Sequence, residues 1–349
     1  MSLLDCIKRI PSCLQNVLGS YEERTKSLVE YLGNNKVDEV VLIASGSSMN
    51  ASKVTKYFAE NKCGLNVKCF FPNEFLNYTN YINRNALYVI VSQGGSTKLV
   101  FECLNKVKEN NLLHCTITEK LESPIAQASN CPFEMGSVNE EYMYRTIGYS
   151  TTVASIALVE LGLAQINGVI TDTKAVLDDL QAAIDNLDAI REVTEEWYLN
   201  NKFSLMKRNQ TIFAGAECLY ETANEADIKI MEMVPMLTRS FELEEFIHGP
   251  QNAFCDNMIF FIFSDKRHDA EKARHIAEFL KNEIGFCALI GDQKLDDRDL
   301  TFEFKSTDFT MLEAITTIQV IAFHLAEDHG RDLKRGVNTV IGNYIKKTL

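Results

Sequence analysis

Two short segments rich in glycine, serine and threonine each follow a run of apolar residues. The first is Ser45-Gly-Ser-Ser-Met-Asn50 and the second is Ser92-Gln-Gly-Gly-Ser-Thr97. Glycine lets a backbone approach a ligand closely, and hydroxyl groups at the start of a helix favour an anion. Serine and threonine also commonly cap helices, so one such segment alone is more typical of capping. Two segments at the same sheet edge favour a phosphate site, formed by Gly46, Ser47, Ser48, Ser92, Gln93, Gly94, Ser96 and Thr97.

A second group of candidate residues combines carboxylates with a lysine and a histidine. Glu225, Lys229 and Glu232 recur at helical spacing and share one helix face, and His248 stands before a Gly-Pro pair. The simpler alternative is a solvated Glu–Lys face with a structural histidine. An imidazole titrates near neutral pH, so the pairing of Glu232 with His248 favours a functional role. No His and Cys cluster has metal-ligand spacing, and we expect neither a metal nor a cofactor.

The elements that would position these residues form an internal repeat. The apolar strands of the first half are predicted at residues 40–46, 86–92 and 114–118, and those of the second at 211–215, 258–264 and 287–292. Helix patterns follow the first two strands of each half, at residues 51–60, 98–110, 221–233 and 270–283. Each half closes on a long amphipathic helix that begins with a Thr-Thr pair, at Thr151 and at Thr316. The same elements in the same order indicate a duplicated domain.

This alternation of elements predicts the fold class. Continuous apolar strands alternating with helices of ten or more residues are typical of parallel sheets covered on both faces. We therefore predict an α/β protein with two tandem doubly wound parallel sheets, each an α/β/α sandwich. The predicted segments are a helical lead-in at 1–34, a first domain at 35–170, a connecting helix at 171–200, a second domain at 201–335 and a tail at 336–349. The lead-in is expected to break at Pro11 and around Gly19.

The matching loops of the second half carry different side chains. They read Gly215-Ala-Glu-Cys-Leu-Tyr and Ser264-Asp-Lys-Arg-His, with carboxylates where an anion would bind. Ligands of open α/β sheets bind beyond the carboxyl ends of the strands. We therefore expect one phosphate site per chain, in the first half.

Composition excludes two classes of partner. The chain of 349 residues has a net charge of −13 and shows no basic stripe, so we expect no binding to nucleic acid. No apolar run reaches the length of about 18 residues that a membrane span needs, and the N-terminus has no signal-peptide pattern. Ten scattered cysteines with apolar neighbours are typical of a reducing compartment. We expect a cytoplasmic protein without a membrane segment.

Together these motifs resemble the sugar isomerase (SIS) domain family over nearly the whole chain. The closest likeness is to the isomerase half of glucosamine-6-phosphate synthase and to fructosamine-6-phosphate deglycases. The motifs that carry it are Gly46-Ser-Ser48 with Asn50, Ser92–Thr97, Glu225 with Lys229 and Glu232, and Glu245-Phe-Ile-His-Gly-Pro250. The spacing of sixteen residues from Glu232 to His248 also agrees with that family.

The resemblance implies a role for each motif. Ser48, Ser92, Gln93 and Thr97 would hold the sugar phosphate, with Ser47 beside them. Glu232 would be the base that moves a proton between C1 and C2. His248 would assist ring opening and reach the site of a neighbouring subunit. An acidic substrate-binding residue falls on Glu140 or Glu141, and Lys229 is a further candidate for substrate binding.

The chain also departs from the family pattern. Gly94 replaces the second serine of the phosphate loop, and Ser96 replaces its glutamate. The tail lysine that helps ring opening in the synthase falls on Ile341, and Lys346 or Lys347 would have to replace it. No glutaminase domain precedes residue 35, so we do not expect amination fed by glutamine.

These residues support more than one activity. Proton transfer between C1 and C2 serves both the isomerisation of a ketose phosphate and the deglycation of a 1-amino-1-deoxyketose 6-phosphate, and we favour deglycation. A non-catalytic sensor of phosphosugars is the third possibility. The expected ligand is a small phosphorylated sugar or sugar-amine. The resemblance implies a homodimer or higher homo-oligomer. The sequence supports it, since Phe241, Phe246, Ile247 and Phe254 are expected to form an exposed apolar patch around the His248 turn.

Overall fold

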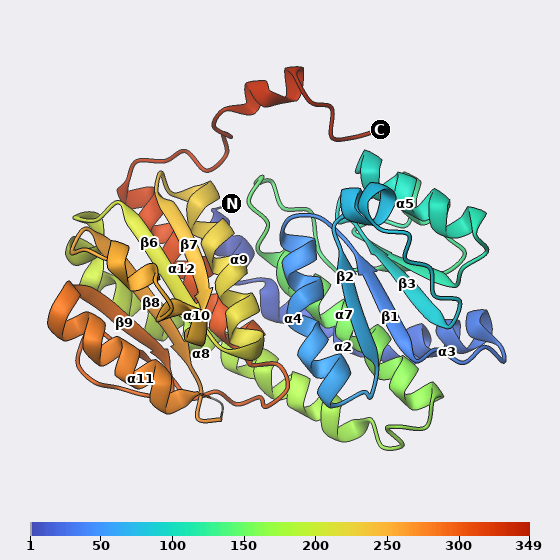
Figure 1. The fold of residues 1–349 in the computed structure, drawn as a ribbon, viewed down its shortest axis with the longest axis horizontal. Coiled ribbons are helices and arrows are strands. Elements are labelled where there is room, and N and C mark those ends of the chain that lie inside the picture. Colours follow the sequence, from blue (N-terminus) through green and yellow to red (C-terminus); the bar gives the residue numbers. More distant parts are fainter. Residues whose placement is uncertain (1, 268) are drawn as a thin grey trace. The chain divides into compact units, whose positions relative to one another are not determined.

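The protein consists of two compact α/β units, each built on a five-stranded parallel sheet (Figure 1). The structure is a computed structural model, and it describes residues 2–267 and 269–349. The N-terminal unit comprises Ser12–Glu141, Arg145–Asp178 and Gly336–Leu349. The C-terminal unit comprises the residues up to Pro11, Tyr142–Tyr144 and Asp179–Arg335. The tail thus packs with the N-terminal unit, and the first eleven residues of the expected lead-in with the other. The predicted domain limits stay predictions.

The N-terminal sheet has the strand order β2-β1-β3-β4-β5. Its strands are β1 (Glu39–Ile43), β2 (Asn66–Phe70), β3 (Ala86–Val91), β4 (His114–Thr118) and β5 (Pro132–Glu134). β1 pairs in parallel with both neighbours, so that Ile43 lies beside Phe70 and Ile90. The strands β1, β3 and β4 are buried throughout, as expected of strands covered on both faces.

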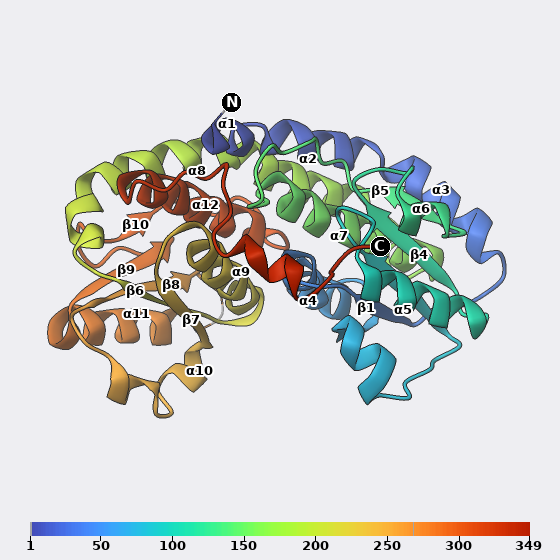
Figure 2. The same cartoon turned by 90° about the horizontal axis from the view of Figure 1, so that it is seen from above.

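Helices cover both faces of this sheet (Figure 2). α5 (Lys98–Glu109) and the π-helix η1 (Glu74–Tyr78) form an apolar cluster with one face. α4 (Ser47–Asn61) and α7 (Ile147–Ile166) lie side by side on the other, and α3 (Tyr21–Leu32) packs on α7. The shorter helices of the unit are α6 (Pro124–Gln127) and η4 (Thr339–Asn343), and α2 (Ile10–Gly19) begins at its boundary.

The C-terminal sheet repeats the same strand order. Its order β7-β6-β8-β9-β10 matches β2-β1-β3-β4-β5 strand for strand, and all its pairs are parallel. The strands are β6 (Gln210–Gly215), β7 (Leu237–Glu242), β8 (Met258–Ser264), β9 (Phe286–Gly291) and β10 (Leu300–Thr301). The identical order confirms the predicted pair of doubly wound parallel sheets.

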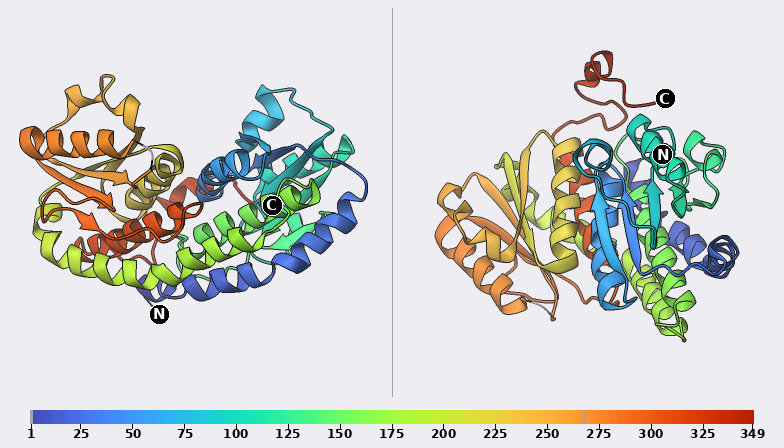
Figure 3. Two further views of the ribbon diagram at one scale, coloured as in Figure 1. Left: turned by 90° about the horizontal axis from the view of Figure 1, so that it is seen from below. Right: turned by 45° about the vertical axis from the view of Figure 1, so that its right-hand side comes forward.

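The helices of this unit follow the same plan. α9 (Glu217–Met233) and α12 (Thr310–Asp328) pack against each other on one face, in the places of α4 and α7. α10 (Leu243–Phe246) and α11 (Ala270–Phe279) form an apolar cluster with the other face. The connecting helix is α8 (Lys174–Met206), one continuous helix in Figure 3. The short helices are α1 (Leu3–Ile7), η2 (Pro250–Ala253) and η3 (Leu280–Ile284).

Several predicted boundaries were wrong. α8 begins three residues later than expected and ends at Met206. By contrast, the lead-in is interrupted close to both predicted places: α1 ends at Ile7 and α2 begins at Ile10, with Pro11 in its first turn, and α2 ends at Gly19. The closing helices α7 and α12 begin at Ile147 and Thr310, before their Thr-Thr pairs.

The closing helix α7 is also not amphipathic. It is buried continuously from Ile147 to Ala164, because α3, α4 and β4 all pack against it. By length and composition it would pass as a membrane span, but the whole apolar stretch is buried within the structure. Its polar Glu160 is fully buried and accepts a hydrogen bond from Thr55 Oγ1 at 3.2 Å. α7 therefore serves as the core helix of its unit.

Candidate functional site

The two glycine- and hydroxyl-rich loops meet at one edge of the N-terminal sheet. One follows the carboxyl end of β1 and the other that of β3, and these strands are paired neighbours. Together they line a cavity of about 220 Å³. Apart from Val91 and Val100, the residues lining it are Ser45, Ser47, Ser48, Ser92, Gln93, Gly94, Thr97 and Arg145. Of the eight predicted phosphate-site residues, six line the cavity, while Gly46 and Ser96 do not.

Helix capping does not account for these hydroxyl groups. The N-cap residue of α4 is Gly46, which has no side chain to cap with and adopts a φ of +59°. The N-cap residue of α5 is Thr97, and its side chain makes no cap hydrogen bond. Two helix N-termini thus begin beside the same cavity without side-chain caps, and such ends attract anions.

Close packing fixes the loop after β3. Ser92 Oγ and Thr97 Oγ1 lie 3.2 Å apart, and Ser92 is buried. Gln93 Nε2 donates to Glu119 Oε2 at 3.1 Å. Gly95 has a φ of +59°, and a Cβ atom there would overlap the side chain of Ser123. The hydroxyl groups are therefore held by a backbone that has little room to move.

The C-terminal tail pairs its backbone with this loop. Thr348 forms an antiparallel bridge with Thr97, and Leu349 N donates to Ser96 O at 3.0 Å. Lys98 N donates to Lys347 O, also at 3.0 Å. Backbone contacts thus bring the Lys347 segment to the loop, whereas Ile341 lies in η4 with half of its surface exposed.

Arg145 is a cavity residue that the sequence interpretation missed. It lies just before α7, and its Nη1 donates to Glu140 O at 3.1 Å. The predicted phosphate-site residues are glycines, a glutamine and hydroxyl residues next to strands, and Arg145 belongs to a different segment. The sequence contains no signal for it, because the closing helix was predicted to begin at Thr151, whereas α7 begins at Ile147.

Glu140 has a structural role. Its Oε1 accepts hydrogen bonds from Thr146 N, Thr146 Oγ1 and Ile147 N at 2.8–3.0 Å, and its Oε2 accepts from Gly148 N at 3.1 Å. A carboxylate at a helix N-terminus satisfies amides that have no partner within the helix. Glu140 is therefore engaged by α7, while Glu141 is exposed. Of the two predicted alternatives, Glu141 stays a candidate for substrate binding.

The acidic and basic residues of α9 are not a solvated face. Glu225 and Lys229 are fully buried, and Glu232 is 32% exposed. Lys229 Nζ lies 2.7 Å from Glu232 Oε1 and 3.6 Å from Glu225 Oε1. Lysine and glutamate are rarely buried completely unless they are paired. The simpler alternative is wrong for Glu225 and Lys229, and the lysine orients the carboxylate of Glu232.

His248 lies apart from Glu232 within the C-terminal unit. Its Nε2 is 3.0 Å from Glu244 Oε1, and its side chain is 61% exposed. Lys272 and His248 hold the pKa of Glu244 below its usual value. Glu232 lies before the amino end of β7, and His248 lies beyond its carboxyl end. The two residues are therefore separated by the length of a strand of six residues, which rises about 3.3 Å per residue. His248 and Glu232 are therefore not in contact within the C-terminal unit, and the role of His248 in the site of a neighbouring subunit stays a prediction.

The apolar side chains around the His248 turn are mostly internal. Phe246 is buried, and Phe241 and Phe254 pack against the apolar core of the C-terminal unit. Phe246 and Phe254 have ring centroids 4.7 Å apart. Ile247 is 45% exposed. The expectation that all four face water was wrong, because the turn folds back onto the sheet.

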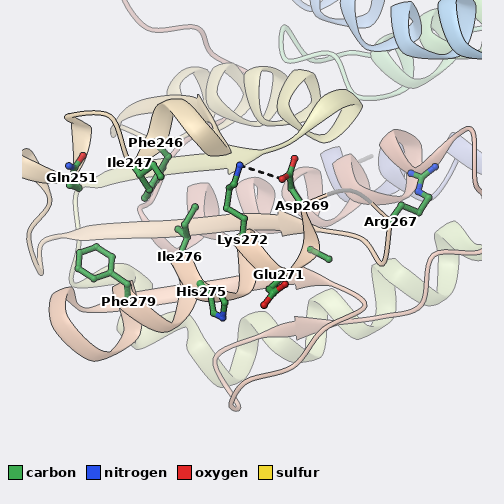
Figure 4. Close-up of a pocket in the computed structure, with 11 residues that line it drawn as sticks. Phe246, Ile247, Gln251, Arg267, Asp269, Glu271, Lys272, His275, Ile276 and Phe279 are labelled. Atoms are coloured by element: carbon green, nitrogen blue, oxygen red, sulfur yellow. Dashed lines mark ion pairs between the residues drawn. The ribbon is translucent and has the colours of Figure 1, made fainter.

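A larger cavity, of about 990 Å³, lies in the C-terminal unit between α10 and α11 (Figure 4). Phe246, Ile247 and Phe279 line its apolar part. Its lysine and its arginine are paired with carboxylates: Lys272 lies 2.8 Å from Glu244 Oε2 and 3.4 Å from Asp269 Oδ1, and Arg267 lies 2.7 Å from Asp265 Oδ2. This cavity therefore lacks the features of an anion site. Within residues 2–267 and 269–349, no group of three His, Cys, Asp or Glu side chains could hold a metal ion.

Comparisons with known proteins agree with this architecture. Residues 35–163 match the model of the SIS domain. The chain is 23% identical over 295 residues to the glutamine–fructose-6-phosphate aminotransferase (isomerizing) of Haemophilus influenzae, which covers 81% of this chain and 48% of that protein. The chain thus spans about half the length of the curated relatives it matches.

Two solved structures show the same fold over nearly their full length. One is a provisionally named phosphosugar isomerase of Clostridium difficile 630, with a TM-score of 0.89 and 21% identity, covering 100% of this chain and 99% of that one. The other is the C-terminal domain of glucosamine-fructose-6-phosphate aminotransferase from Francisella tularensis, with a TM-score of 0.85 and 19% identity. It covers 95% of this chain and 98% of that one.

Proposed function

This chain contains a SIS domain, and on that basis we propose that it binds a small phosphorylated sugar and moves a proton between its C1 and C2 atoms. The observation that carries the proposal is the cavity at the carboxyl ends of β1 and β3. It combines serine and threonine hydroxyl groups with the uncapped N-termini of α4 and α5. A phosphate group suits this combination because it accepts several hydrogen bonds and carries negative charge.

Glu232 is the proposed base. Its carboxylate is partly exposed and is oriented by the buried ammonium group of Lys229. From a 1-amino-1-deoxyketose 6-phosphate it would remove a proton at C1 and leave an enolamine. Return of the proton to C2 gives an imine at C1, which water hydrolyses to an aldose 6-phosphate and a free amine. Proton transfer of this kind needs a positioned general base.

Deglycation is the first choice among the possible outcomes. The motifs that combine Glu232 with His248 resemble those of the fructosamine-6-phosphate deglycases, and the same base would also isomerise a ketose phosphate. Isomerisation stays the second candidate, because proteins with the SIS fold include chains named as phosphosugar isomerases. We further propose that the protein works in the cytoplasm as a homodimer or higher homo-oligomer.

One assay separates these activities. The protein is incubated with a panel of fructosamine 6-phosphates and with simple ketose 6-phosphates, and amine release and aldose formation are followed separately. Release of amine supports deglycation, and formation of aldose from the free ketose phosphate supports isomerisation. Binding of the panel without turnover would indicate a sensor and contradict the enzymatic proposal. The Glu232→Gln protein is the control for contaminating activity.

A further inference from the structure

Arg145 occupies a special position in the N-terminal unit. It lies at the end of the segment that connects β5 to α7, and it lines the same cavity as Ser48, Ser92 and Thr97. Arginine presents a planar fork of N–H donors that matches the oxygens of a phosphate group. The resemblance to known families assigned no role to this residue.

The C-terminal unit shows what the equivalent position does there. Thr151 and Thr316 are matching residues, since each begins the Thr-Thr pair of its closing helix. Aligning α7 and α12 on this pair places Arg145 opposite Thr310. Thr310 Oγ1 accepts a hydrogen bond from Arg267 Nη2 at 3.2 Å, and Arg267 belongs to the loop after β8. The start of the closing helix and this loop are therefore in direct contact in the C-terminal unit.

Each unit thus has an arginine where the loop after β3 or β8 meets the start of the closing helix, but the arginine belongs to a different segment in each unit. In the C-terminal unit the arginine is on the loop, and the loop also supplies its anion: Arg267 Nε and Nη2 donate to Asp265 Oδ2 at 3.1 and 2.7 Å. In the N-terminal unit the arginine is on the helix side, and the Ser92–Thr97 loop contains no carboxylate. Gln93 stands at the position of Asp265, and its amide carries no charge.

We propose that Arg145 binds the phosphate group of the ligand, which takes the place that Asp265 has beside Arg267 in the other unit. This inference rests on the proposed function, since it assumes that a phosphorylated ligand enters this cavity. Arg145 then supplies the positive charge, and the hydroxyl groups of the loops complete the set of donors. The interaction is one of binding rather than of catalysis.

Calorimetric titration of inorganic phosphate and of fructose 6-phosphate tests this proposal. We expect the Kd of Arg145→Gln to rise by about 10- to 100-fold for both ligands, because a charge-assisted contact is lost. Arg145→Lys should lose less affinity, since it keeps the charge without the planar fork. The matched control is Arg84→Gln, an exposed arginine of the same unit whose Nη1 donates to Asn110 O at 3.2 Å, and its Kd should not change.

The outcomes separate this inference from the proposed function. If the wild-type protein binds neither ligand, the proposed phosphosugar site is wrong, and the role of Arg145 falls with it. If the wild type binds but Arg145→Gln has the same Kd, only the inference about Arg145 is overturned. An equal loss in the Lys and Gln variants, together with lower melting temperatures, would show that Arg145 acts by holding the Glu140 segment and would also overturn it.

Discussion

The loops after β3 and β8 stand at the same place in two sheets of identical strand order, but their side chains differ. The N-terminal loop presents Ser92 and Thr97 to a cavity. In the C-terminal loop, Arg267 bonds to Asp265, to Thr307 O and to Thr310. The second loop therefore pairs its own arginine with its own aspartate. The same backbone plan thus carries the proposed anion site in one unit and an ion pair in the other, and the side chains make the difference.

The matching helices α4 and α9 differ in the opposite sense, because here the C-terminal unit carries the candidate functional residues. The buried polar residues of α4 include Ser52 and Thr55, which are small and neutral. α9 instead buries Glu225 and Lys229 beside the partly exposed Glu232. Burying charged groups is costly unless they are paired, so a site that keeps them is a candidate for function. This difference agrees with the proposal that the N-terminal unit binds the phosphate group and that the C-terminal unit supplies the base.

The largest effect should come from removing the proposed base. Glu232→Gln keeps the shape of the side chain without its basicity, and we expect kcat to fall by about 10²- to 10⁴-fold. The Kd for the phosphosugar, measured by calorimetry, should stay within a few-fold. Glu60→Gln, near the end of the matching helix α4, is the control and should leave kcat unchanged. Wild-type turnover in Glu232→Gln would remove this residue from the mechanism.

The next largest effect concerns the hydroxyl groups of the N-terminal loop. Ser92→Ala combined with Thr97→Ala removes two hydrogen bonds to an anion, and we expect KM to rise by about 10²- to 10⁴-fold. Ser264→Ala, at the position of Ser92 in the C-terminal loop, should leave KM as it is. The proposed difference between the two loops would be wrong if both changes raised KM equally, or if neither change raised it.

Backbone geometry gives the third prediction. Gly95→Ala should lower the free energy of unfolding by about 2–4 kcal/mol, because a side chain at positive φ is strained and its Cβ meets Ser123. Gly94→Ala is the control, since its Cβ has Ser96 Oγ at 4.0 Å as its nearest neighbour. Thermal unfolding of both variants checks this. Equal melting temperatures would show that the loop is less tightly packed than described.

The ion pair of the C-terminal loop gives a smaller effect. Asp265→Asn removes the carboxylate that faces Arg267, whose side chain is 36% exposed. We expect a loss of stability of about 1–2 kcal/mol after solvent screening, with no change in the Kd for phosphate. Denaturant unfolding and calorimetry measure the two quantities. A changed Kd would mean that this loop takes part in binding.

The last prediction concerns division of labour between chains. If His248 completes the site of a neighbouring chain, mixing inactive His248→Ala chains with inactive Ser92→Ala/Thr97→Ala chains restores one intact site per mixed dimer. Activity should then return to at most half of the wild-type value per dimer. The measurement is turnover before and after subunit exchange. No recovery on mixing would mean that both groups must belong to one chain.

The sequence predicted the strands better than the ends of the helices. Apolar runs such as residues 258–264 coincide with β8, because a buried strand needs apolar residues at every position. α4 begins at Ser47 rather than at residue 51, because its first turn consists of the hydroxyl-rich residues that suggested a loop. α12 begins six residues before its Thr-Thr pair, since a helix buried on all sides has no apolar periodicity to mark its start.

Only part of the candidate site was predicted, because the sequence shows which segments follow strands but not where a buried helix begins. The loops at Ser45–Asn50 and Ser92–Thr97 follow apolar strands, and a parallel sheet brings the ends of neighbouring strands together. Arg145 could not be found in this way, because its contribution depends on where α7 starts. Phe246 and Phe254 were assigned to the surface because the fold-back of the turn onto the sheet leaves no periodic signal.

The apolar character of α7 also has consequences for the synthesis and the heat inactivation of the protein. Within its unit, α7 follows every strand of the sheet in chain order, so the face it covers stays bare during synthesis until Ile166 has emerged. Until then, and whenever the unit opens on heating, apolar surface is exposed to other chains. Chains that expose such surface aggregate faster than they refold. Heat inactivation of this protein is therefore expected to be irreversible and to depend on protein concentration, so that a half-life describes its durability better than an equilibrium constant does.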